Sequence, residues 1–214
     1  MRPLLFGLGL AVLGACGAPE SPHMQATTDG EGAQALGRAN VVRGTVLGQG
    51  IEVRDAVYMR YPLKHVDGEP IETVSILLSD KPNLCHYLRH DSVPRNLALF
   101  GITLQRGPRL VVNPGDYDVQ APVVDPEGGE TRGRAYAQLL RLDEACSPVL
   151  PASSTTYIVA HEGSLELHTG GTEAAPRMKG TFEFSFGPQQ DAVSGRFDAG
   201  LCELRSHEFS NCVD

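Results

Sequence analysis

The chain has 214 residues, a formal net charge of −8 at pH 7 and an aromatic content of only 6%, with no tryptophan. Its acidic balance and the lack of a basic run argue against a nucleic-acid-binding protein, because Lys and Arg contacts to phosphates supply most of that affinity. The length suits one ordinary domain after the N-terminal segments described next.

The N-terminus has one basic residue, Arg2, followed by an apolar run from Leu4 to Ala15. This run is too short to span a bilayer as a helix, which takes about 20 residues. A basic start, a short apolar core and small residues before a boundary are typical of a secretory signal. We therefore expect residues 1–15 to be a signal peptide.

The run ends in "LGAC", and this Leu13-Gly14-Ala15-Cys16 sequence resembles the lipobox of bacterial lipoprotein precursors. The resemblance implies that Cys16 becomes the first mature residue and carries a diacylglycerol and an N-acyl chain. Three acyl chains give a strong membrane anchor, because each buried methylene contributes about 0.8 kcal/mol. Gly17 stands where aspartate would imply retention on the inner membrane, so the resemblance implies the outer membrane, facing the periplasm or the cell surface.

After Cys16 comes "GAPESPHMQATTDGEGAQALGRAN", which is rich in small and polar residues and has no apolar period. Such a composition buries too little surface to offset the entropy of ordering. We expect residues 16–40 to form a flexible, lipidated tether with a root-mean-square span of roughly 25–30 Å. Residues 41–214 would then form a single domain.

Four further cysteines occur at positions 85, 146, 202 and 212, which predicts two disulfides in an exported chain. None of them has CxxC spacing, so a zinc knuckle or a thioredoxin-like motif is not supported. The short separation of Cys202 and Cys212 favours a small terminal loop, which would leave Cys85 with Cys146. The alternative, Cys85 with Cys202, would tie the early part of the domain to its last strand.

Alternation of apolar and polar residues dominates the domain and predicts strands. In "GTFEFSFG" three phenylalanines share one face, and in "GSLELH" two leucines do so. About ten short strands separated by turn signals predict an all-β fold, a mainly antiparallel sandwich or barrel-like structure. The expected strands are 41–47, 51–61, 71–79, 96–105, 115–123, 133–142, 155–160, 163–168, 180–187 and 191–200.

Two local features depart from simple alternation. Asp55 interrupts the apolar face of "IEVRDAVYMRY", which indicates a bulge or a hydrogen-bonded carboxylate near an edge. The stretch "SDKPNLCHYLRHD" predicts a short helix over about 82–90, with Asp80 as its cap and with Leu84 and Leu88 one turn apart. We expect this helix to plug one end of the sheet structure and to be stapled through Cys85.

A second resemblance involves "LSDKPNLC", "PGDYDV" and "GTFEFSFG…DAVSGRFDAGLC", which together look like a family of uncharacterised bacterial lipoproteins common in delta-proteobacteria. Similar β-rich domains of unknown function occur in Bacteroidetes. This resemblance covers most of residues 41–204. It implies a β-rich fold and an envelope location, and it carries no catalytic residues to this chain.

The candidates for chemistry are few. His86 and His90 lie four residues apart on the expected helix, with Asp91 adjacent, so they are weak metal candidates that lack an identifiable third ligand. In "HEGSLELH" the histidines are seven apart across a turn and a strand, unlike a helical zinc-protease motif. No GxSxG elbow occurs. We expect no catalytic residues, no metal and no cofactor.

The expected function is therefore that of a non-enzymatic, outer-membrane-anchored lipoprotein, a structural or recognition module whose partner is an envelope protein or a glycan. Tyr58, Tyr61, Tyr87 and Tyr117 are the aromatic residues that could stack on sugars. One alternative is a small-molecule or lipid carrier with an apolar barrel interior. Another is a metal-binding or hydrolytic envelope protein, which would need converging polar groups in a cleft.

Overall fold

The structure is a computed structural model that describes residues 39–64, 70–106, 111–119, 133–149, 158–172, 175–187, 191–204 and 211–213. The expected signal peptide, Cys16 and the tether up to residue 38 lie outside the described residues. The described part is mostly strand, as predicted. Its elements are β1 (Val41–Gly44), β2 (Asp55–Lys64), β3 (Pro70–Ser79), α2 (Leu84–Arg89), β4 (Ser92–Pro94), β5 (Ala98–Gln105), β6 (Gly115–Val119), β7 (Gly133–Arg141), β8 (Ile158–Thr172), β9 (Ala175–Phe186), β10 (Asp191–Leu201) and β11 (Asn211–Val213).

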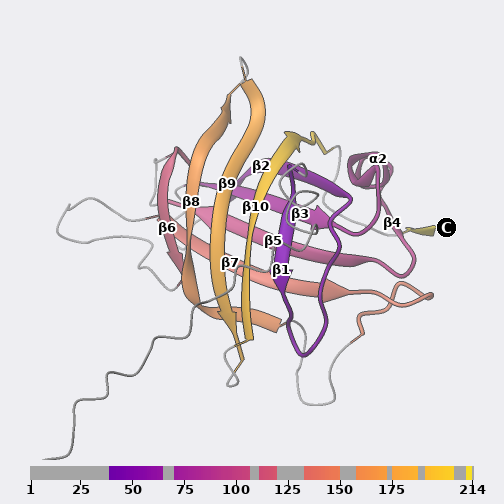
Figure 1. The fold of residues 1–214 in the computed structure, drawn as a ribbon. Helices are drawn as coiled ribbons and strands as arrows, with labels where there is room; N and C mark the ends of the chain where they lie inside the picture. The colour runs from indigo at the N-terminus through magenta and orange to yellow at the C-terminus, as the bar shows by residue number, and fades with distance from the viewer. Residues whose placement is uncertain are drawn as a thin grey trace, which may run out of the picture.

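Nine strands form one sheet in the order β1-β10-β2-β3-β5-β7-β6-β8-β9, and a further pairing of β10 with β9 closes it into a ring. In Figure 1 the strands β6, β8, β9, β10 and β1 form a front layer that runs across β2, β3, β5 and β7 behind it. Most pairings are antiparallel; β10–β2, β6–β7 and β11–β4 are parallel. This confirms the prediction of a mainly antiparallel all-β fold, a sandwich or barrel-like structure.

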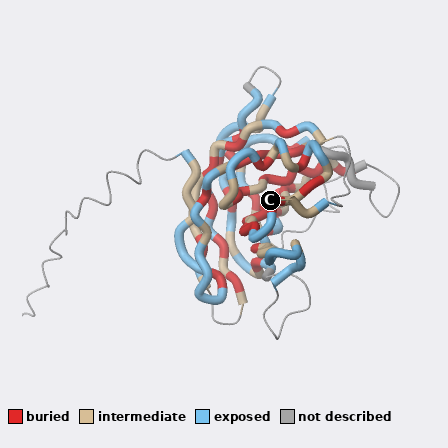
Figure 2. Tube along the Cα trace, turned by 90° about the vertical axis from the view of Figure 1, so that its right-hand side faces the viewer, coloured by how far each residue is buried: buried red, intermediate tan, exposed pale blue. Residues whose placement is uncertain are grey.

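The main core lies between the two layers, where the buried residues gather in Figure 2. Phenylalanine rings fill its middle: Phe100 of β5 stacks on Phe182 of β9 at 5.4 Å between ring centroids, and Phe182 stacks on Phe184 at 5.3 Å. Phe186 meets Phe100 edge-on at 5.9 Å. The period-two pattern of the sequence thus buries these side chains, as expected.

A second, smaller core lies on the opposite face of the β2–β3–β5 layer. There Leu84 and Leu88 of α2 pack with Val57 and Met59 of β2, because successive residues of a strand point to opposite faces. Leu77 and Leu99 border this cluster. The prediction that the helix plugs one end of the sheet is therefore wrong: α2 covers an outer face of the back layer.

The start of the helix also differs from the prediction. The helix begins at Leu84, after Asn83, whose backbone is left-handed (φ 60°). The side chain of Asn83 makes no capping hydrogen bond to the helix. Asp80 accepts a hydrogen bond from Ala98 N instead. The carboxylate at the helix start is that of Asp55, whose Oδ2 accepts a hydrogen bond from Leu84 N at 2.7 Å. The interrupting Asp55 is thus the hydrogen-bonded carboxylate that was one of the two expectations.

The two disulfides join Cys85 to Cys202 and Cys146 to Cys212. The pairing favoured by sequence separation, Cys202 with Cys212, is therefore wrong. Cys202 follows β10, whose end pairs with β2 beneath the helix that carries Cys85. Strand β11 pairs instead with β4, and this places Cys212 beside the turn that contains Cys146.

Residues 158–160 and 163–168, which belong to two different expected strands, lie in one strand, β8, and residues 155–157 lie outside the described residues. The sequence "HEG" was predicted to be a turn. It lies within the strand instead, where the pairing with β9 shifts its register between Ala160 and Glu162. Gly163 adopts φ +129° next to this irregularity. As a result β8 and β9 form a long, continuous pair whose outer face carries the groove described next.

Candidate functional site

The outer face of the front layer carries the most organised set of charged side chains in the described residues. Its strands lie in the order β6-β8-β9-β10-β1, and their registers align the outward residues in two rows that cross all five strands. One row is Asp118, Ser164, Glu183, Ser194 and Arg43, and the other is Asp116, Glu166, Thr181, Arg196 and Val41.

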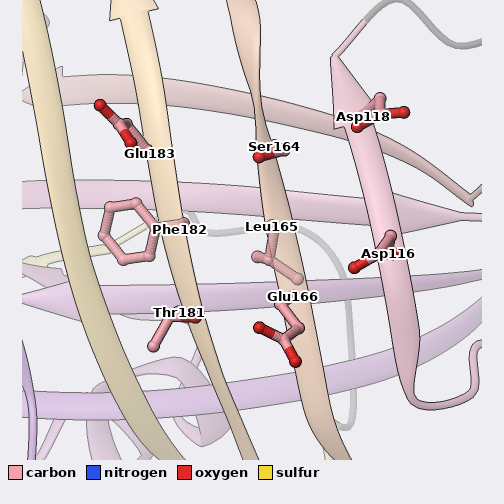
Figure 3. Close-up of a pocket in the computed structure, with 8 residues that line it drawn as sticks. All are labelled: Asp116, Asp118, Ser164, Leu165, Glu166, Thr181, Phe182 and Glu183. Atoms are coloured by element: carbon pink, nitrogen blue, oxygen red, sulfur yellow. The ribbon is translucent and has the colours of Figure 1, made fainter.

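The β6–β8–β9 end of these rows is acidic. The carboxylates of Asp116, Asp118, Glu166 and Glu183 line a shallow groove with a volume of about 440 Å³. Figure 3 shows these side chains on β6, β8 and β9. Asp116 lies directly opposite Glu166 across the β6–β8 pairing. Like charges in that position cost stability, so this arrangement is electrostatically unfavourable for the isolated domain.

The β10–β1 end is basic. A second groove of about 280 Å³ is lined there by Arg43 and Arg196, together with the hydroxyl side chains of Ser194 and Thr181. Arg43 is exposed and has no hydrogen bond or ion pair in the described structure. Arg196 is half-buried. The guanidinium groups therefore come from two neighbouring strands on one face.

Glycines allow β1 to lie this close to β10. A Cβ atom at Gly195 would come within 2.2 Å of Val41 O and 2.6 Å of Phe182 Cζ. At the end of β1, Gly44 adopts φ +93°, and a Cβ there would lie 2.0 Å from Ala192 O. Larger residues at these positions would displace β1 and, with it, Arg43.

The two grooves are neighbours, because Thr181 and Phe182 of β9 line both of them. We call the whole surface the bipolar face: its acidic half is Asp116, Asp118, Glu166 and Glu183, and its basic half is Arg43 and Arg196. Neighbouring strands lie about 4.8 Å apart, so the opposite charges at the β6 and β1 edges are separated by roughly 19 Å.

Charged side chains next to the bipolar face are paired with one another, and one of them, His168, lies near Glu166 of the acidic half. Arg177 Nε bonds Asp198 Oδ1 at 2.5 Å, and Lys179 Nζ lies 3.4 Å from Asp198 Oδ2. His168 lies 3.6 Å from a carboxylate oxygen of Glu166 and 3.4 Å from the Thr181 hydroxyl. Arg43 differs from Arg177 and Lys179 in having no such acidic partner.

Buried polar groups at one end of the ring serve the fold. The guanidinium of Arg60 bonds Glu72 and the carbonyl of Gly170, which connects β2, β3 and β8. Nearby, burial raises the pKa of Tyr117 above its ordinary value of 10.0, and the positive charge of Arg106 opposes this shift. Burial likewise raises the pKa of Tyr58, against the lowering influence of Arg60.

The weak metal candidates, His86 and His90, do lie together. Both are exposed on α2, and their ring centroids are 4.6 Å apart. Asp91 follows the helix, and its N–H bonds Leu88 O. Within the described ranges, however, no group of three or more His, Cys, Asp or Glu residues is placed to hold a metal ion. The structure therefore adds no third ligand to the pair.

Two of the four tyrosines named as candidate sugar platforms are buried in the core. Tyr58 and Tyr117 are buried in the main core, at 1% and 0% exposure, so neither ring can stack on a sugar. Tyr87 is half-buried on α2, and the side chain of Tyr61 lies outside the described residues. Among the tyrosines whose side chains are described, the exposed one is Tyr136 of β7, which has the Arg134 guanidinium 4.6 Å from its ring centroid.

Sequence reasoning missed the bipolar face. Alternation does place the side chains of Glu166, Glu183 and Arg196 on the outer face of their strands. The neighbour relationships are what the sequence hides, because β6 lies beside β8 and β1 lies beside β10. Only these non-local pairings separate the acidic residues from the basic ones.

The fold and the site together define a disulfide-stapled, barrel-like β-domain with a charge-segregated outer face. Comparison with protein-family models, curated proteins and solved structures found no match for this chain. Among the described residues there is no helix with the length and apolar character needed to cross a membrane.

Proposed function

We propose that the protein is a lipid-anchored recognition component of the bacterial outer membrane that acts without catalysis. In this proposal Cys16 carries the anchor, residues 16–40 form the tether, and the β-domain binds an envelope partner, a protein or a glycan, through the bipolar face. The lipobox-like "LGAC" sequence supports the anchor. The bipolar face is the observation that supports recognition.

The electrostatics of that face favour binding over a purely structural role. Asp116 and Glu166 face each other across paired strands, although like charges in this position destabilise a sheet. At the opposite edge Arg43 has no hydrogen-bond or ion-pair partner among the residues that the structure describes. A ligand with complementary charges would relieve both conditions, and electrostatic complementarity of this kind mainly provides specificity and rapid association.

The interior of the ring of strands supports a recognition role more than the role of a small-molecule or lipid carrier. Phe100, Phe182 and Phe184 stack across the middle of the ring, and the surrounding leucine and isoleucine side chains are almost fully buried. A carrier would instead enclose a cavity of several hundred Å³ in which most of its ligand is buried. Both grooves of the bipolar face are open to the outside.

The anchor is tested on the protein purified from its native membrane. Mass spectrometry should show that the chain begins at Cys16 and carries the mass of the acyl groups. A Cys16→Ser variant should leave the membrane fraction, because the acyl chains provide the attachment. An unmodified thiol at Cys16, or a chain that keeps residues 1–15, would refute this part of the proposal.

The recognition role is tested with charge-neutral variants of the full chain in capture experiments from the native envelope. A triple variant Asp116→Asn, Glu166→Gln, Glu183→Gln, or a double variant Arg43→Gln, Arg196→Gln, should lose the partner that the unaltered chain retains. The triple variant should be at least as stable as the unaltered chain, because it removes like-charge repulsion. Lost binding would therefore not reflect unfolding.

The matched control neutralises exposed charges outside the bipolar face, as in Arg54→Gln combined with Glu203→Gln. This control should capture the partner at the level of the unaltered chain. Equal capture by all of the variants would show that recognition does not use the bipolar face.

A further inference from the structure

The basic half of the bipolar face has a donor arrangement of its own. Arg43 lies directly opposite Ser194 across the β1–β10 pairing, and Arg196 lies directly opposite Thr181 across the β10–β9 pairing. Arg43 and Arg196 are therefore diagonal neighbours, and the Cα atoms of such neighbours are typically about 7–8 Å apart. A small group seated between them would meet two guanidinium groups and two hydroxyls.

The geometry points to a phosphate group. A guanidinium group presents a fixed fork of N–H donors that matches the oxygens of a phosphate or a carboxylate. A planar carboxylate has two oxygens, and a single arginine can contact both of them through its fork. A tetrahedral phosphate has further oxygens directed elsewhere, and these suit a second arginine and hydroxyl donors on the neighbouring strands. Among the described residues that line this groove none is a carboxylate, and the nearest one in the register, Glu183 of β9, lies across Ser194 from Arg43.

We propose that the groove lined by Arg43, Arg196, Ser194 and Thr181 binds a phosphate group of the envelope partner. This inference rests on the proposed recognition function and names the ligand chemistry of its basic half. Lipid headgroups and free phosphate compounds both present such a group. The groove begins at Val41, directly after Asn40, whose Oδ1 accepts a hydrogen bond from Asp198 N at 2.7 Å.

The test is isothermal titration calorimetry of the full chain in uncharged maltoside micelles, with inorganic phosphate as the probe and ionic strength held constant with chloride. Arg43→Gln and Arg196→Gln should each weaken phosphate binding roughly ten- to hundredfold, because each removes charge-assisted hydrogen bonds. Arg54→Gln removes an exposed arginine outside the groove and should bind phosphate normally. Arg43→Lys should bind at an intermediate level, because it keeps the charge and loses the fork.

A second arm replaces inorganic phosphate with mixed micelles that contain either phosphatidylglycerol or diacylglycerol, which lacks the phosphate. Binding only to phosphatidylglycerol micelles, reduced by added inorganic phosphate, would support the groove and identify the headgroup as the source. Binding to inorganic phosphate without any preference for phosphatidylglycerol would support the groove and identify a free phosphate compound. Circular dichroism of each variant would establish that it is folded.

The inference is overturned if the unaltered chain does not distinguish phosphate from chloride, or if Arg54→Gln weakens binding as much as Arg43→Gln does. Its failure is separable from that of the recognition function. Loss of partner capture in the acidic-half variant, with no phosphate binding by the unaltered chain, would leave the function standing and remove only the inference.

Discussion

The phenol of Tyr117 is fully buried and donates a hydrogen bond to Asn113 O at 2.7 Å. Burial raises its pKa above the ordinary value of 10.0, so the folded state holds this proton more tightly than the unfolded state does. The corresponding stability is fully present below pH 10 and is lost as the pH rises through the higher pKa of the folded state.

We therefore predict that the free energy of unfolding falls above pH 10 and that Tyr117→Phe makes this fall less steep. At neutral pH the same variant should be about 1 kcal/mol less stable, because the hydrogen bond to Asn113 is lost. Urea unfolding between pH 8 and pH 11 measures both effects. An unchanged slope in the variant would show that the ionisation of Tyr117 is not linked to folding.

Asp55 shows how far sequence reasoning reaches for a single residue. Its polar side chain on an apolar strand face predicted either a bulge or a hydrogen-bonded carboxylate, and the structure shows the hydrogen-bonded carboxylate. The partner, Leu84 N, lies 29 residues away. The sequence offered the nearer Asp80 as the helix cap, and local spacing contains no information that would favour Asp55 over it.

At the scale of elements, the two disulfides differ in their surroundings. Cys202 is 1% exposed and packs with α2 and β2, so the first bridge is partly exposed only at Cys85, whereas both Cys146 and Cys212 are partly exposed. Thiol–disulfide exchange requires access to a sulfur atom. We predict that a mild reductant opens Cys146–Cys212 before Cys85–Cys202, as measured by alkylation and mass spectrometry of native protein over time.

Two double variants provide the control. The first, Cys146→Ser with Cys212→Ser, removes one bridge, and the second, Cys85→Ser with Cys202→Ser, removes the other. Each removes a bridge worth about 2–4 kcal/mol, but only the second also disturbs the cluster between α2 and β2. It should therefore lose more stability in urea unfolding. Simultaneous reduction of both bridges in the native protein would contradict the predicted order.

The presence of the helix and of the strands was predictable, because apolar–polar alternation and a one-turn spacing of leucines are local signals. The disulfide pairing was not, because it depends on β11 lying beside β4 and on β10 ending beneath α2. The continuity of β8 was also hidden. "HEG" has the composition of a turn, and the pairing of β8 with β9 accommodates it as an irregularity within the strand.

For the whole molecule, the closed ring of strands predicts one cooperative core. Phe100 contacts Phe182, Phe184 and Phe186 from the opposite layer. Phe100→Ala should therefore cost about 3–5 kcal/mol while urea unfolding remains a single transition. Val159→Ala is the control, since this side chain is 49% exposed and its loss should cost less than about 0.5 kcal/mol. Separate transitions for the two layers would contradict the prediction.

The fold class was predictable from the sequence and the bipolar face was not. As for the disulfides, the reason is that local patterns are visible in the sequence and non-local pairings are not. Strand identity is encoded within a few residues, but the order β6-β8-β9-β10-β1 results from how the whole chain packs. Glu166 and Arg196 look like ordinary outward polar residues until that order places them at opposite halves of one surface.

The way β10 divides its pairing between β1 and β2 has a mechanical consequence. If the chain is held at its N-terminal end, a pulling force reaches the domain at Asn40 and acts first on the four residue pairs between β1 and β10. These pairs can separate one after another from Val41, while β10 stays held by β9. Tension would thus peel away Arg43 and dismantle the basic groove while the rest of the barrel stays intact.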